Sequence, residues 1–107
     1  MMAEDLTRIY DRATFLFDNK EFVKAAELFA QLAQEEPDHL EVRMWLARAY
    51  YHSAQLGRAE EVLEAVVDRW PSEAYAHLLL ARTLQRAGRA DEGRQHLKIA
   101  EAMGLTE

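Results

Sequence analysis

The side chains best suited to catalysis or metal binding are four histidines and two pairs of adjacent glutamates. His77 and Glu73, one helical turn apart, supply only two metal ligands, and no other histidine has a suitably spaced partner. The carboxylates of neighbouring glutamates diverge on a helix instead of facing one substrate. The sequence has no cysteine, no phosphate-binding glycine loop and no Gly-x-Ser-x-Gly motif. It therefore predicts no enzyme, no metal and no cofactor. The residues considered are His39, His52, His77, His96, Glu35–Glu36 and Glu60–Glu61.

Arginine and aromatic residues form the second chemically distinctive set. Trp45, Arg48, Tyr51 and their neighbours recur at intervals of three and four, opposite the apolar face around Ala47. Arg82 follows Arg48 after 34 residues. Arginine together with tyrosine and tryptophan is the composition of binding hot spots, and the guanidinium fork binds carboxylates through two hydrogen bonds. The pattern predicts a surface that binds a protein or peptide with acidic groups and at least one apolar anchor.

A repeat of 34 residues positions these side chains. Pro37 and Pro71 are one period apart, and shifting the chain by one period superimposes three further sets of small or apolar residues. A period of this length is typical of stacked helical hairpins, none of which buries its apolar face alone. We predict helices at about 5–18, 21–35, 39–54, 57–69, 73–87 and 90–103. The superimposed sets are Ala13, Ala47 and Ala81; Ala25, Ala59 and Gly93; and Phe29, Leu63 and Leu97.

The predicted helix ends rest on residues that cap helices or adopt left-handed backbone. Asp38 and Glu41 after Pro37 have the form of a capping box, and Ser72 after Pro71 is the matching N-cap. Three residues lie where short turns are needed and tolerate a positive φ: Asn19, Gly57 and Gly88. Within the last helix, Gly93 is expected to allow a neighbouring helix to approach closely.

This pattern resembles the tetratricopeptide repeat, whose signature runs from a W-x2-L-G-x2-Y segment through A-x3-F to a closing proline. The resemblance implies an all-α fold: a right-handed superhelical stack of three helix-turn-helix repeats, an alpha-alpha solenoid of six helices. Residues 1–107 would form one domain, with repeats at about 5–37, 38–71 and 72–105. The matching residues are Ala13, Leu16, Ala25, Phe29 and Pro37; then Leu46, Ala47, Tyr50, Ala59, Leu63 and Pro71; then Leu80, Ala81, Leu84, Gly93 and Leu97.

The resemblance also implies where a partner would bind. Members of the family bind an extended peptide or a helix in a concave groove, lined mainly by the first helix of each hairpin. Some members clamp the C-terminal carboxylate of heat-shock chaperones, but the matching positions Tyr10, Thr14, Trp45, Tyr75 and Leu79 lack the required amides and positive charges. The predicted groove residues are Tyr10, Phe17, Trp45, Arg48, Tyr51, His52, Tyr75, Arg82 and Arg86.

Composition limits the other functional classes. The net charge of −6 argues against nucleic-acid binding, which relies on a basic surface. Glutamates and an aspartate from residue 60 to residue 68 predict an acidic back and a more basic groove. No apolar run approaches a membrane span, and the acidic start lacks the order of a secretion signal. We therefore expect a cytoplasmic protein.

The leading hypothesis from the sequence is a small adaptor that holds a partner in its groove. The alternative is a structural, self-assembling protein, such as a homodimer formed through Phe15 or the Met103–Leu105 end, or by groove insertion of a neighbouring chain's terminus. A helical-repeat RNA reader is a third option. Net acidity and the missing basic residues at Thr14 and Asp18 argue against it.

Overall fold

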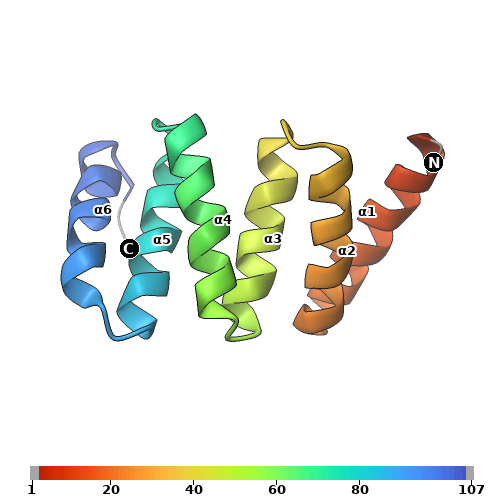
Figure 1. The fold of residues 1–107 in the computed structure, drawn as a ribbon, viewed down its shortest axis with the longest axis horizontal. Coiled ribbons are helices and arrows are strands. Elements are labelled where there is room, and N and C mark those ends of the chain that lie inside the picture. Colours follow the sequence, from red (N-terminus) through yellow and green to blue (C-terminus); the bar gives the residue numbers. More distant parts are fainter. Residues whose placement is uncertain (1–2, 106–107) are drawn as a thin grey trace. The chain divides into compact units, whose positions relative to one another are not determined.

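The computed structural model describes residues 3–105, and this part of the chain forms six helices and no strand (Figure 1). Each helix begins and ends within about two residues of its predicted bounds, which is the usual scatter of such boundaries. The helices are α1 (Ala3–Asp18), α2 (Phe22–Glu35), α3 (Leu40–His52), α4 (Leu56–Arg69), α5 (Ala74–Arg86) and α6 (Ala90–Ala102). The all-helical prediction is confirmed.

The chain divides into two compact units, Met1–Ala54 and Gln55–Glu107. The first unit contains α1, α2 and α3, and the second contains α4, α5 and α6. The boundary therefore falls inside the second predicted repeat, between its two helices. A single domain over 1–107 stays a prediction, as do the repeat limits.

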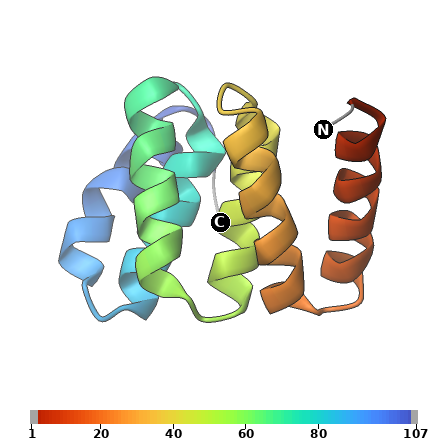
Figure 2. The same cartoon turned by 45° about the vertical axis from the view of Figure 1, so that its right-hand side comes forward.

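In the first unit, α2 packs against both α1 and α3 (Figure 2). Ala13 of α1 and Ala25 of α2 are fully buried, and side chains this small let helix backbones approach each other. Phe29 and Leu32, one and two helical turns further along α2, are also fully buried. Val42 of α3 completes this core. Each fully buried side chain of this size contributes roughly 1.5–3 kcal/mol of transfer free energy.

In the second unit, α5 packs against both α4 and α6. Leu63 and Val66 from α4 and Leu80 from α5 are fully buried. The predicted close approach at Gly93 is confirmed, because a Cβ atom placed there would lie 2.8 Å from the Ala81 carbonyl oxygen. Only a residue without a side chain fits at this point of α6.

The left-handed turn residues follow the repeat more closely than they follow residue type. Gly88 has a φ of 81°, as predicted. Asn19 lies in the turn between α1 and α2, as predicted, but the positive φ is at Lys20 (63°). The prediction for Gly57 is wrong, because the positive φ is at Ala54 (61°). Lys20, Ala54 and Gly88 are successive positions of the 34-residue period. The connection between helices thus fixes the position, and only the third copy places glycine there.

Asn19 and Gly57 have other surroundings. The Asn19 side-chain amide donates a hydrogen bond to the carbonyl of Phe15, at 2.8 Å. Gly57 lies inside α4, and a Cβ atom there would meet nothing within 4 Å.

The predicted N-caps are also wrong, each by one residue. His39 is the N-cap of α3, and its Nδ1 accepts a hydrogen bond from the Val42 amide at 3.3 Å. Glu73 is the N-cap of α5 and makes no side-chain capping bond. The reason is a turn around each proline, closed by the His39 amide on Glu36 and the Glu73 amide on Trp70. Asp38 and Ser72 belong to these turns, so each helix begins one residue later than predicted.

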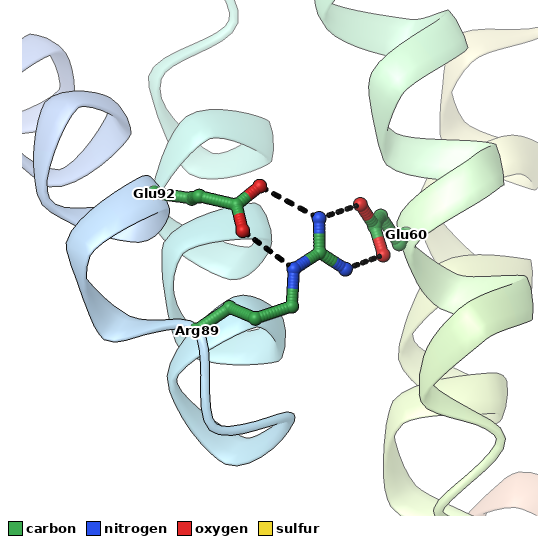
Figure 3. A network of polar contacts seen from close by, with 3 residues as sticks. All are labelled: Glu60, Arg89 and Glu92. Atoms are coloured by element: carbon green, nitrogen blue, oxygen red, sulfur yellow. Dashed lines mark hydrogen bonds and ion pairs between the residues drawn. The ribbon is translucent and has the colours of Figure 1, made fainter.

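An ion-pair network joins α4 to the start of α6 in the second unit (Figure 3). The Arg89 guanidinium donates two hydrogen bonds to the Glu60 carboxylate, at 2.8 and 2.9 Å, and two to Glu92, both at 2.7 Å. These bonds raise the pKa of Arg89 and lower the pKa of Glu92. The pKa of Glu64 is raised by partial burial and by the nearby Glu60 carboxylate. Glu60 is therefore paired, so the acidic face predicted for α4 is partly neutralised.

No helix within residues 3–105 is long and apolar enough to cross a membrane.

Candidate binding surface

Arg48 is the centre of the candidate site in the first unit. Its guanidinium carbon lies 4.4 Å from the centroid of the Trp45 ring and 5.3 Å from that of Phe17. Stacking on an aromatic face holds a guanidinium in place while leaving its N–H groups at the edge. Within the described residues, no acceptor takes a hydrogen bond from Arg48, and no carboxylate pairs with it. The side chain is half-buried and oriented, with its donors unused by these residues.

Trp45 is itself fixed by contacts with α1 and α2. Its ring stacks on the buried Phe29, with centroids 5.4 Å apart and planes 11° from parallel. Its Nε1–H donates a hydrogen bond to the Tyr10 hydroxyl at 3.1 Å. Phe17 meets the same ring edge-on, at 5.0 Å. Three helices therefore hold the indole on which Arg48 rests, so the guanidinium is placed before any partner binds.

The aromatic contacts continue toward the C-terminal end of α3. His52 stacks on Phe22 with centroids 4.8 Å apart, and it meets Phe17 edge-on at 5.6 Å and Tyr51 at 5.5 Å. The sequence prediction missed Phe22 and Phe29, because both belong to the second helix of a hairpin and not to the predicted groove helices. The signal was their spacing of seven residues, which places both on one face of α2.

In the second unit, the matching arginine has different surroundings. Arg82 is half-buried, and residue 79, one period after Trp45, is a leucine that is 4% exposed. Leu78 is equally buried, so neither leucine is part of an open surface. Tyr75 is 37% exposed, and Arg86 is exposed at the end of α5. The predicted residues thus form an aromatic and cationic cluster in the first unit, whereas in the second unit no aromatic ring lies at the position that matches Trp45.

A pocket of about 430 Å³ opens beside the aromatic cluster in the first unit. Its floor is apolar, since Leu32 and Val42 are almost fully buried. Its two charged residues are Glu36 and Glu41, both exposed. Tyr10 belongs to both the pocket and the aromatic cluster, since its hydroxyl bonds to Trp45. The lining residues are Leu6, Thr7, Tyr10, Leu32, Glu36, His39, Glu41 and Val42.

Two histidines that are far apart in the sequence meet in the second unit, His77 of α5 and His96 of α6. The Nδ1 atoms of His77 and His96 lie 3.1 Å apart, and the rings stack at 5.4 Å. Packing of α5 on α6 creates this contact, which spacing along one helix does not reveal. The His77 Nε2 atom lies 2.9 Å from the Pro71 carbonyl, which only accepts, so Nε2 carries the proton. In the neutral pair, His77 Nδ1 therefore accepts from His96.

The environment lowers the pKa of His96, first through burial and second through the charge of a protonated His77. Two protonated rings would place two N–H groups against each other, so the contact accommodates one extra proton at most. Within residues 3–105, no group of three or more histidine, cysteine or acidic side chains is arranged to hold a metal ion.

The model of one family, described as "Tetratricopeptide repeat", matches residues 16–69 and 55–103. Comparison with curated protein sequences gives no match.

Solved structures with a similar fold include a CopN–Scc3 complex and the Yersinia enterocolitica type III secretion translocator chaperone SycD, described as an alternative dimer. The first has a TM-score of 0.87 and 17% identity over 100% of this chain and 63% of that chain. SycD has a TM-score of 0.86 and 17% identity over 95% of this chain and 77% of that chain. MamA (MSR-1) has a TM-score of 0.87 and 19% identity over 95% of this chain and 59% of that chain. This chain thus spans less than two thirds of two of these, and the likeness concerns the fold.

Proposed function

We propose that this chain, which belongs to the tetratricopeptide repeat family, is a non-catalytic adaptor that binds an acidic segment of a partner protein through Arg48 and the aromatic residues around it. The segment is a peptide or a helix with at least one apolar anchor. The family match supports an interaction module in general. The identity of the groove residues and the chemistry of the partner are part of the proposal.

The observation that carries the proposal is the state of the Arg48 guanidinium. It is seated on Trp45 and Phe17, and no acceptor within residues 3–105 uses its donors. A guanidinium that is already stacked on an aromatic ring loses little conformational entropy when a carboxylate binds, because its side chain is already ordered. Partial burial also weakens the competition from water. These conditions favour a two-bond contact with an aspartate, a glutamate or a C-terminal carboxylate.

The surrounding rings suit the apolar anchor. Tyr51 and Phe17 are half-buried, so each keeps part of its ring surface accessible. Rigid aromatic surface next to an arginine is the usual composition of the residues that dominate a protein interface. The second unit has cationic and aromatic groups of its own, Tyr75, Arg82 and Arg86, which belong to the proposed set.

The composition of the chain bears on its partners and on its location. A net charge of −6 disfavours nucleic acid and anionic membrane as ligands. The lack of cysteine agrees with the reducing cytoplasm. We place the adaptor there.

Affinity capture from the native lysate tests the proposal. Wild type is compared with Arg48→Ala/Arg82→Ala, and captured proteins are identified by mass spectrometry. Arg12→Ala is the matched control, because Arg12 is exposed on α1 and makes no polar contact with the described residues. We expect a protein retained by wild type and by Arg12→Ala but lost from the double variant. Equal retention by all three would overturn the role of the arginines.

Self-assembly remains the second candidate, because the surface carries exposed apolar side chains. Phe15 is 65% exposed and Val23 is 55% exposed in the first unit, and Met103 is 43% exposed in the second. Exposed apolar side chains mark an interface where they gather into one contiguous patch. If the ends mediate assembly, Phe15→Glu or Met103→Glu would lower the mass measured by light scattering, while the arginine variants would leave it unchanged.

A further inference from the structure

The pocket beside the aromatic cluster has the chemistry of a site for a long cationic side chain. It is large enough for a lysine or arginine, at about 430 Å³. Leu32 and Val42 give it an apolar floor suited to an aliphatic stem. Lysine and arginine place their stems along apolar surface and keep the charged head near water. The exposed Glu36 and Glu41 stand where that head would lie.

The two carboxylates have no competing partner nearby. Within the described residues, neither Glu36 nor Glu41 forms an ion pair or a side-chain hydrogen bond. Arg43, the nearest arginine in sequence, gives its Nε–H to the Pro37 carbonyl at 2.7 Å. Within residues 3–105, no lysine or arginine lines the pocket, and the ring of His39, which also lines it, accepts a hydrogen bond from the Val42 amide. A cation supplied by a partner would therefore meet two unpaired acceptors.

The pocket and the Trp45 ring on which Arg48 stacks belong to one face of the first unit. The Tyr10 ring lines the pocket, and its hydroxyl accepts the bond from Trp45, the ring beneath Arg48. Along α3, Glu41 and Arg48 are seven residues apart, or two helical turns. Two turns advance about 10 Å along the axis. One face thus presents negative charge at one end and positive charge at the other.

We propose that this face selects a peptide with a lysine or arginine about three residues from an acidic group, in either chain direction. A peptide in the polyproline II conformation advances about 3.1 Å per residue with three residues per turn, so side chains three residues apart point the same way and cover about the distance between the two ends. The cationic side chain occupies the pocket at Glu36 and Glu41, and the carboxylate binds Arg48. This inference rests on the proposed function and specifies its partner: a dipolar segment and not a uniformly acidic one.

The same face does not recur at the matching positions of the second unit. One period after Glu36 and Glu41 stand Trp70 and Tyr75. The pair of glutamates at the pocket, Glu36 and Glu41, is therefore specific to the first unit. This is expected if the pocket fixes the register in which a peptide binds.

A peptide array tests the inference with all 107 residues of the chain. The probes are peptides of alanine, serine and leucine that carry one lysine and one glutamate at every separation, in both orders. Peptides with only the lysine, only the glutamate or neither serve as references. Affinities of selected peptides are then measured by fluorescence anisotropy. We expect the tightest binding near a separation of three, weakened about three- to ten-fold when alanine replaces the lysine.

Charge reversal at the pocket gives the decisive comparison. Glu36→Lys/Glu41→Lys should reverse the preference, so that a second glutamate in place of the lysine binds better. Glu27→Lys/Glu61→Lys is the matched control, because both residues are exposed and the net charge changes equally. The control should keep the wild-type preference. Circular dichroism confirms that each variant is folded.

Failure of the inference is distinguishable from failure of the proposed function. Binding that depends on the glutamate and is lost in Arg48→Gln, with no dependence on the lysine, overturns the pocket inference alone. A lysine preference equal in wild type and in Glu36→Lys/Glu41→Lys also overturns it. If no peptide binds in a way that Arg48→Gln weakens, both are overturned.

Discussion

The two units share the spacing of one repeat, yet side chains at matching positions make different contacts. In the first unit, Arg48 rests on Trp45, whereas the residue one period after Trp45 is the buried Leu79. In the second unit, Arg89 binds the carboxylates of Glu60 and Glu92. The backbone of a repeat thus fixes where side chains lie, while residue identity decides whether they stabilise the unit or remain available to a ligand.

The largest expected effect concerns the close helix contact of the second unit. Gly93→Ala would place a Cβ atom 2.8 Å from the Ala81 carbonyl oxygen, a backbone atom that moves only if α5 and α6 separate. We expect a loss of about 1–3 kcal/mol in the free energy of unfolding. Urea denaturation followed by circular dichroism measures it.

Gly57→Ala is the control for that substitution. Gly57 also lies in a helix, but a Cβ atom there meets nothing within 4 Å. The change should stabilise the chain by about 0.5–1 kcal/mol, because alanine is the better helix former. Equal effects of the two substitutions would show that helix propensity, and not the contact with Ala81, governs Gly93.

A second prediction makes the first unit resemble the second. Trp45→Leu introduces the residue found at position 79 and removes the ring beneath Arg48. The guanidinium then has no indole ring to stack on. We therefore expect about ten-fold weaker binding of a captured partner, measured by isothermal titration calorimetry. Tyr10→Phe, which removes only the hydroxyl that accepts from Trp45, should weaken binding less. Wild-type affinity in Trp45→Leu would show that stacking does not position Arg48 for the partner.

A third prediction compares the turns. Lys20 and Ala54 adopt the positive φ that Gly88 adopts without strain. Lys20→Gly and Ala54→Gly should each stabilise the chain by up to about 1 kcal/mol, because glycine relieves the strain of a left-handed residue. Gly88→Ala should destabilise it by a similar amount. Thermal unfolding measures all three, and a loss of stability in both glycine variants would contradict this explanation of the turns.

The smallest expected effect is a pH dependence confined to the second unit. The folded-state pKa of His96 is lowered, so the unfolded chain binds more protons near the ordinary histidine pKa of about 6.5. The stabilisation is therefore complete above about pH 6.5 and is lost as the pH falls through the folded-state pKa. Urea titrations at successive pH values should show a shallower slope for His96→Gln than for wild type. An unchanged slope would exclude His96 as its source.

Helix positions could be predicted from the sequence because prolines and apolar spacing mark them directly. The turn residues could not, since position in the repeat decides the backbone angle, and Lys20 and Ala54 give no compositional signal. The caps shifted by one residue because the turn around each proline is closed by backbone bonds, which any residue supplies.

The candidate site was predictable only in part. Spacing along α3 placed Trp45 and Arg48 on one face, one turn apart. It could not show that Phe29 supports the tryptophan, or that His77 meets His96, because both contacts depend on how one helix packs against another. The pocket was missed for the same reason, as its lining comes from three helices and a loop.

The central claim is that a stacked guanidinium, and not positive charge alone, binds the partner's carboxylate. Arg48→Lys tests it most directly, because lysine keeps the charge but loses the planar fork and its stacking. The measurement is the affinity of the captured partner segment for wild type, Arg48→Lys and the control Arg12→Ala by isothermal titration calorimetry. The account predicts at least about ten-fold weaker binding for Arg48→Lys and no change for Arg12→Ala. Wild-type affinity in Arg48→Lys would contradict it.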